Sequence, residues 1–173
     1  MATQKKQKCA VSSQHNPAIT IRTLTEEDAP EVIKLMRQVF KKAAIDACIE
    51  KRMGGTPWHK TKNALVKKQI AENTAGCFVA LMDDQIVGFI STAVNTVASR
   101  GWIIDLAVSN VCQGHGIGGK LIKKALQYFR KLKLHHAKIE TLDTNVVGEH
   151  LYTKLGFVEV ARQIHFAMPL QKE

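Results

Sequence analysis

Four glycines lie close together in residues 113–120, and their spacing is the clearest sign of chemistry in this chain. Gly114, Gly116, Gly118 and Gly119 lack a Cβ atom, so the backbone there can approach a bound anion closely. An amphipathic helix is expected to follow, and its first N–H groups would point outward with no partner inside the helix. The helix dipole adds partial positive charge at the same end. The segment therefore predicts a phosphate-binding loop.

Three phosphate-binding patterns overlap on this loop. Residues 114–120 read G-x-x-x-x-G-K, the start of a nucleoside-triphosphate loop, but Leu121 stands where a Ser or Thr hydroxyl should hold magnesium. Three of the glycines also fit the dinucleotide pattern G-x-G-x-x-G, with Glu140 at a suitable distance to bind a ribose. Against that interpretation, the preceding strand is expected to end near Val108, several residues before the first glycine. Only a short tail follows Glu140.

The third pattern, Q-x-x-G-x-G over residues 113–118, resembles the signature of the GNAT superfamily of acyl-CoA-dependent N-acyltransferases. An apolar triplet, Leu-Ala-Val at 106–108, precedes the loop as it does in that family. A second block of the family pattern follows at the expected distance, with Asn145 and then L-Y-x-x-x-G-F at 151–157. The similarity of layout extends over residues 19–170. It identifies the chain as similar to acetyl-CoA-dependent N-acetyltransferases.

The resemblance implies an α/β (α+β) fold. The expected sheet is mixed and mostly antiparallel, has six to seven strands, is splayed in its middle and is flanked by about four helices. Residues 18–173 are expected to form a single N-acetyltransferase domain after a flexible tail at 1–17. Residue patterns predict helices at 25–40, 61–71, 117–132 and 146–154, and a loop over most of 41–60. They predict strands at 19–22, 77–82, 86–94, 102–108 and 137–141, and a final pair at 157–160 and 164–168.

The resemblance also implies where acetyl-CoA binds, and no metal ion is expected. Backbone groups of the 106–108 strand end would hydrogen bond the pantetheine amides like an added strand, and loop N–H groups would bind the pyrophosphate. The N–H group of Val108 would polarise the thioester carbonyl. Asn145 would contact the cofactor beside the thioester. The expected cofactor-binding residues are Leu106, Ala107, Val108, Gln113, Gly114, His115, Gly116, Ile117, Gly118, Gly119, Asn145 and Tyr152.

The implied reaction is direct transfer of the acetyl group to a primary amine of a small molecule, peptide or protein. A lysine-like amine with a pKa near ~10.4 is only about one part in two thousand neutral at pH 7, so a base must help. Glu140 lies five residues before Asn145, where some peptide-acetylating family members carry their catalytic glutamate. That role requires a buried carboxyl group. A strand-end carboxylate paired with a lysine is the equally weighted alternative.

Tyr152 occupies the general-acid position of the family pattern. Its phenol would donate a proton, or at least a hydrogen bond, to the leaving thiolate; the alternative is an aromatic ring that only packs against the sheet. Many family members carry a glutamate on the strand before the glycine loop, where this chain has Trp-Ile-Ile at 102–104. Asp105 is the only carboxylate of that strand and is a second candidate base. Simple alternation places it on the face of Ile103 and Ala107, unless a bulge intervenes.

The chain has 25 Lys and Arg against 15 Asp and Glu, a formal net charge of +10. A basic surface can attract nucleic acid, but the expected cofactor is itself a polyanion, and Lys120, Lys123 and Lys124 flank its site. A nucleic-acid partner is therefore not expected. Two alternatives remain: a CoA-binding regulatory module without catalysis, and a basic nucleic-acid-associated protein, whose binding would be steeply salt-dependent.

The cysteines and the apolar runs bear on location. The four cysteines are widely spaced with no C-x-x-C, which suits a reducing cytoplasm better than a disulfide scaffold or a zinc site. No apolar run approaches the length of a membrane span. We expect a cytoplasmic protein that binds acetyl-CoA and an amine, has no membrane partner and is compatible with a homodimer.

Overall fold

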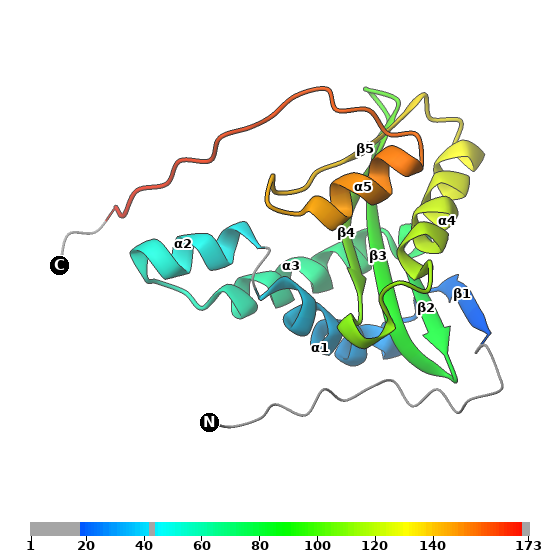
Figure 1. Ribbon diagram of the computed structural model, residues 1–173, viewed down its shortest axis with the longest axis horizontal. Coiled ribbons are helices and arrows are strands. Elements are labelled where there is room, and N and C mark those ends of the chain that lie inside the picture. The colour runs from blue at the N-terminus through cyan, green and yellow to red at the C-terminus, as the bar shows by residue number, and fades with distance from the viewer. Residues whose placement is uncertain (1–17, 42–43, 171–173) are drawn as a thin grey trace.

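A twisted sheet forms the centre of the molecule. A computed structural model describes residues 18–41 and 44–170, and the expected tail at 1–17 lies outside them (Figure 1). Among the described residues the sheet has five strands in the order β1-β2-β3-β4-β5. Neighbouring strands are antiparallel, except that β4 and β5 are parallel. The strands are β1 (Ile19–Thr23), β2 (Phe78–Met82), β3 (Gln85–Asn95), β4 (Arg100–Val108) and β5 (His136–Ile139).

Helices cover both faces of the sheet and bury an apolar cluster on each. Helix α4 packs on one face and buries Leu121 and Phe129, and half-buried residues of α5 join that cluster. Helices α1 and α3 pack on the other face, where Val32 and Val66 are fully buried. The predicted apolar face of α4 is confirmed, with Leu132 as an exposed exception. The helices are α1 (Ala29–Phe40), α2 (Ile45–Met53), α3 (Trp58–Glu72), α4 (Ile117–Lys131) and α5 (Val146–Lys154).

Close packing between β4 and α4 depends on Gly101. A Cβ atom at that position would lie 2.5 Å from the ring of Phe129, so only glycine lets the helix approach the strand so closely. The predicted β2–β3 hairpin is confirmed, and its turn residues Asp83 and Asp84 have φ values of 50° and 60°. Both lie in the left-handed region that tight hairpin turns require.

The first helix begins as its capping pattern predicts. The carboxylate of Asp28 accepts a hydrogen bond from the N–H group of Thr25 at 2.8 Å, and a short 3-10 turn, η1 (Glu26–Asp28), leads into α1. Arg22 of β1 donates two further hydrogen bonds to this carboxylate, at 2.6 and 2.8 Å. The hydrogen bonds from Arg22, more than those from Thr25, hold the pKa of Asp28 at about 2. The side chain of Asp28 thus joins β1 to the start of α1.

The prediction of a loop over most of 41–60 is wrong. Helix α2 occupies much of that segment, and α3 begins at Trp58, three residues earlier than expected. The break is limited to residues 54–57, where Gly54 and Gly55 have φ values of 72° and 95° and Pro57 precedes α3. The glycines were visible in the sequence, but they end one helix and precede another. Residues 42–43 lie outside the described part of the chain.

The predicted final pair of strands is also wrong. Residues 157–170 form no strand, so the described sheet has five strands instead of six to seven, and five helices flank it instead of about four. The alternation of apolar residues is typical of strands, but a strand also needs a neighbour to bond with. Figure 1 shows this segment extending away from the sheet beyond α5. In the described residues no helix combines the length and hydropathy needed to cross a membrane.

Candidate functional site

Strand β4 has one edge that is only partly paired. It pairs with β3 along its whole length, but with β5 only from Arg100 to Ile103. Residues 104–108 therefore form an open edge of the sheet, because β5 ends at Ile139 and the chain then turns away. The N–H group of Ser109 donates to Val87 of β3 at 2.8 Å. Since successive N–H groups of a strand point to opposite sides, that of Val108 points toward the open edge.

A bulge in β4 decides where Asp105 lies. Ser91 pairs with Asp105 and Thr92 pairs with Ile103, so Ile104 is an extra residue in this strand. Ile103 consequently packs into the cluster under α4, whereas Asp105 and Ala107 lie on the α1/α3 face. The simple alternation is thus correct for Asp105 and Ala107 but fails for Ile103.

Asp105 is a buried carboxylate paired with a lysine of α3. Its side chain is 2% exposed and that of Lys62 is 13% exposed, and one carboxylate oxygen of Asp105 accepts a hydrogen bond from the ammonium group. The other oxygen has no hydrogen-bond partner among the described residues. The ammonium group of Lys62 also lies 4.7 Å from the ring centroid of Phe40 at the end of α1. A charged pair therefore lies beneath the open edge, on the side of α1 and α3.

The glycine loop, residues 113–119, connects this edge to α4. Gly114 and Gly116 have φ values of 84° and 72°, a left-handed conformation that favours glycine. A Cβ atom built at either position would meet nothing within 4 Å, so the space in front of the loop is open. Gly116 is the N-cap of α4, and no side chain in the described part of the chain caps this end of the helix. The N–H groups of its first turn are therefore available to an anion.

Gly118 and His115 of the loop contact other residues of the protein. A Cβ atom at Gly118 would lie 3.1 Å from Leu151 of α5, and within 4.0 Å of Leu106 and Val108. Gly118 thus brings α5, the start of α4 and the open edge together. The Nδ1 atom of His115 lies 3.1 Å from the carbonyl oxygen of Gln113, so the His115 ring contacts the backbone of its own loop.

Two buried residues limit what their side chains can do. The side chain of Ile117 is buried against the sheet, so only its backbone N–H group can face a ligand. Leu121 is fully buried in the same cluster. This burial excludes position 121 as a magnesium ligand of a nucleoside-triphosphate loop.

Asn145, Thr141 and Tyr152 form a polar chain at the start of α5. The carbonyl oxygen of the Asn145 side chain accepts from Gly148 N–H at 3.1 Å and caps α5, and its amide nitrogen donates to Thr141 Oγ1 at 2.7 Å. Thr141 in turn hydrogen bonds Tyr152. Burial raises the pKa of the Tyr152 phenol, and this hydrogen bond opposes part of the rise. The sequence reasoning did not identify Thr141, whose only signal was its place at the end of a predicted strand.

Glu140 lies just beyond β5 at the surface. Its side chain is 44% exposed and forms an ion pair of 2.6 Å with Lys138, whose ammonium group lies 4.9 Å from the ring centroid of Trp102. This is the lysine-paired arrangement that was one of the two expectations for Glu140. The burial that a base at this position requires is not present in this conformation.

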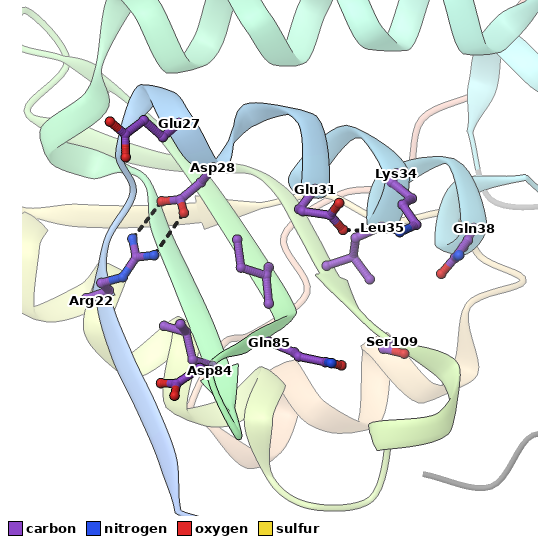
Figure 2. Close-up of a pocket in the computed structure, with 12 residues that line it drawn as sticks. Arg22, Glu27, Asp28, Glu31, Lys34, Leu35, Gln38, Asp84, Gln85 and Ser109 are labelled. Carbon is purple, nitrogen blue, oxygen red and sulfur yellow. Dashed lines mark hydrogen bonds and ion pairs between the residues drawn. The ribbon is translucent and has the colours of Figure 1, made fainter. Parts of the chain in front are cut away.

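A surface pocket lies elsewhere on the molecule. Figure 2 shows it between η1, α1 and the β2–β3 hairpin, and its walls include the ion pair of Arg22 with Asp28. The pocket has a volume of about 580 Å³. None of the expected site residues lines it, although Ser109 at the end of β4 does. The open edge and the glycine loop, not this pocket, combine the unpaired backbone groups that the sequence predicted as a binding site.

One family model matches the part of the chain that holds the open edge, the glycine loop and Tyr152 of α5. Residues 34–157 match the model of the "Acetyltransferase (GNAT) family". The chain therefore belongs to that family, as its two sequence blocks predicted. Members of this family are N-acetyltransferases that use acetyl-CoA.

Two curated relatives match this chain over only part of their own length. The mycothiol acetyltransferase of Tsukamurella paurometabola is 32% identical over 126 residues, which cover 64% of this chain and 43% of that protein. N-alpha-acetyltransferase 30 of Dictyostelium discoideum is 29% identical over 92 residues, which cover 52% of this chain and 50% of that protein. The chain thus matches no more than half the length of these relatives.

Solved structures support the predicted fold. PH1933 from Pyrococcus horikoshii OT3 superposes with a TM-score of 0.67 and 23% identity, covering 84% of this chain and 92% of that one. The PaiA N-acetyltransferase from Thermoplasma acidophilum, solved in complex with coenzyme A, gives a TM-score of 0.65 and 19% identity, with coverages of 82% and 90%. At these identities the likeness concerns the fold alone. The GNAT-like fold predicted from the sequence is confirmed.

Proposed function

We propose that residues 18–173 form one N-acetyltransferase domain, which transfers the acetyl group of acetyl-CoA directly to a primary amine of a small molecule, peptide or protein. The open edge of β4 carries this proposal, because its unpaired backbone groups lead directly to the glycine loop. An extended chain such as pantetheine can pair with that edge as an added strand does. A pyrophosphate fits where helix N–H groups point outward. The family assignment supports the same reaction.

In this proposal the cofactor is bound mainly by backbone groups. Residues 106–108 bind the pantetheine amides, and the N–H groups of residues 113–119 bind the pyrophosphate. The N–H group of Val108 points toward the open edge and would stabilise the negative charge that develops on the thioester oxygen. Asn145 already uses its side chain to cap α5, and one hydrogen of its amide nitrogen remains for the cofactor.

We propose Glu140 as the base, acting directly or through a water molecule, with Asp105 as the second candidate. Each carboxylate must leave its lysine before it can accept a proton from the acceptor. The Glu140–Lys138 pair is half exposed, and separating such a pair costs about 1 kcal/mol or less. The Asp105–Lys62 pair is buried, and separating it leaves a buried charge at a cost of several kcal/mol. The exposed carboxylate is therefore the easier one to free, and in this proposal the bound acceptor and cofactor supply the burial that the role requires.

Tyr152 is proposed as the general acid toward the leaving thiolate. Burial raises the pKa of its phenol, so the group keeps its proton through the physiological pH range. Thr141 Oγ1 accepts a hydrogen bond from Asn145, and its own hydrogen can therefore be donated to the phenol oxygen. In that arrangement the phenol O–H is left to point at the sulfur atom. Thr141 acts as a positioning residue for Tyr152.

The names of the relatives point to two classes of acceptor amine, a small molecule and a protein N-terminus. One relative is named for mycothiol, a small molecule, and another for N-alpha-acetylation. We propose that the segment from the end of α1 to the start of α3 shapes the acceptor side, because Lys62 contacts Phe40 there and pairs with Asp105. A buried ion pair at this place would favour an acceptor that approaches with its amine uncharged.

The experiment that tests the function is acetyl-CoA-dependent thiol release with a panel of small amines and peptides. Acetyl-CoA should also raise the melting temperature of the protein, because a ligand that binds only the folded state stabilises it. NAD is the matched control and should produce no shift. The proposal is contradicted if acetyl-CoA neither shifts the melting temperature nor is consumed with any acceptor in the panel, while NAD does bind.

The same reaction implies the protein's partners and its location. Acetyl-CoA and an amine-bearing acceptor are the proposed partners, with no membrane or nucleic acid, and the cytoplasm is the proposed compartment. Free thiols at Cys48 and Cys77 support a reducing environment. We also propose that the protein is a homodimer.

A further inference from the structure

The segment after α5 is the least covered part of the described chain. Residues 157–170, called the C-terminal arm here, form neither helix nor strand, and Figure 1 shows them extending away from the sheet. Apolar side chains alternate along the arm with the period of two that is typical of a half-buried strand. The large apolar side chains that are 73–91% exposed are Val158, Val160, Ile164, Phe166, Met168 and Leu170.

Exposure of this kind is unusual for a folded chain. Single exposed apolar residues such as Val97, in the turn between β3 and β4, need no explanation. A continuous row of them marks a surface that binds another protein surface. The alternating pattern predicted strands in this segment. The arm thus has the residue pattern of a strand, but it pairs with no neighbouring strand among the described residues.

The arm is held so that it leaves its own domain. Gly156 has a φ of 91°, and the N–H group of Phe157 donates to the carbonyl oxygen of Tyr152 at 3.1 Å, which fixes the exit from α5. Arg162 pairs with Glu159 at 2.7 Å and approaches Glu149 of α5 at 4.0 Å, so the first half of the arm stays beside that helix. The arm contains no glycine, and none of its residues has a positive φ. A tight hairpin turn within it is therefore absent.

Strand β5 supplies the matching surface. It is an edge strand of the described sheet, paired with β4 on one side only. Ala137 and Ile139 are half buried against the cluster under α4, so an added strand could extend this apolar layer. An edge with unpaired N–H and C=O groups is a template for another strand.

We propose that the C-terminal arm of one copy pairs as a strand with β5 of a second copy, while the second copy's arm pairs with β5 of the first. An exchange of identical segments closes into a two-fold dimer, the commonest symmetry of soluble oligomers. The arm of 14 residues reaches about 45 Å when extended, which is long enough to cross onto a neighbouring molecule. Ile164, Phe166 and Met168 supply the apolar face of the exchanged strand.

This exchange is independent of the transferase function, but it would affect the same site. Glu140 and Thr141 directly follow β5. An arm from the second copy that pairs with β5 therefore lies beside them. Under the proposed function, each acceptor side would be completed by the partner copy.

Light scattering after size-exclusion chromatography tests the assembly on the full chain. The protein should have twice the 19.2 kDa mass of one chain. The double variant Ile164→Asp/Phe166→Asp should halve that mass, and Val97→Asp, which changes an apolar residue that is 98% exposed elsewhere, should leave it unchanged. A single-chain mass for the unchanged protein, or a dimer that persists in the double variant, overturns the proposal.

Photo-crosslinking tests the exchange itself and does not depend on enzyme activity. The variant Phe166→p-benzoyl-phenylalanine should give an adduct of two chains whose crosslinked peptide contains residues 136–139. An adduct within one chain would mean that the arm folds back on its own β5. A two-chain adduct that joins the arm to any other segment would mean a different dimer. Either result overturns the exchange while leaving the acetyltransferase assignment intact.

Discussion

The two sides of the opening next to β4 are built from different kinds of groups. The proposed cofactor side consists of backbone N–H and C=O groups at residues 104–108 and in the glycine loop. The proposed catalytic and acceptor side consists of side chains from distant parts of the chain, such as Lys62 of α3, Asp105 of β4 and Tyr152 of α5. Backbone groups are common to nearly all residues, whereas side chains differ. The cofactor side should therefore respond mainly to changes of backbone shape, and the acceptor side to changes of chemical group.

The largest effect is expected at the buried pair on the acceptor side. Asp105→Ala leaves the Lys62 charge buried without a partner and should lower the free energy of unfolding by about 3–5 kcal/mol. The double variant Asp105→Leu/Lys62→Met removes both charges and should lose much less. Urea denaturation measures both. A single variant that loses less than about 1 kcal/mol would mean that the pair behaves like a solvated surface pair.

The next effect is catalytic. Tyr152→Phe keeps the ring and removes the phenol O–H, so kcat should fall about 100-fold, the lower range for general acid catalysis, while acetyl-CoA affinity stays nearly constant. Thr141→Val should produce a smaller fall, because it only frees the phenol to rotate, and Thr141→Ser should restore the rate. Tyr128→Phe is the matched control, since its hydroxyl donates to Asn73 outside the site. Unchanged turnover in Tyr152→Phe would remove this residue from the mechanism.

The third effect concerns the pH dependence of stability at Asp28, which lies outside both sides of the opening and serves as a reference for changes at either side. The folded-state pKa of Asp28, about 2, is below its ordinary value of 3.8. Its contribution of about 2 kcal/mol is therefore fully present above pH 4 and is lost as the pH falls toward 2. Asp28→Asn should flatten that part of the stability curve, measured by thermal unfolding from pH 2 to 6. Glu31→Gln, at an exposed pair with Lys34, should change it little, and equal effects of the two substitutions would contradict the assignment.

The smallest effect is expected on the cofactor side and concerns backbone shape alone. Gly116→Ala places a Cβ on a residue with a φ of 72° and should weaken acetyl-CoA binding about tenfold, since left-handed backbone costs a non-glycine residue roughly 1–2 kcal/mol. Gly119→Ala is the control, because its Cβ would meet only Leu151 at an ordinary 3.8 Å. Calorimetric titration measures both. Equal affinities for the two variants would mean that the loop does not need this conformation.

The cofactor side could be predicted from the sequence because its parts are contiguous. The triplet at 106–108, the loop glycines and the helix that follows are local features, and hydrophobic periodicity is sufficient to locate such a helix. The β2–β3 hairpin and the exit from α5 at Gly156 were predictable for the same reason. The acceptor side was harder, because the bulge at Ile104, the pair of Asp105 with Lys62 and the role of Thr141 each depend on contacts between separate segments.

By itself, the sequence determined the family and the class of fold, and it predicted the backbone groups proposed to bind acetyl-CoA. Glycine spacing and apolar periodicity act within a few residues, so they can be read without knowing the rest of the molecule. Only the tertiary structure decided that Glu140 is exposed beside Lys138, that α2 occupies the expected loop and that the arm after Gly156 is not part of its own sheet. Strand pairing and burial are set by neighbours from elsewhere in the chain, and an alternating pattern does not name the strand it will pair with.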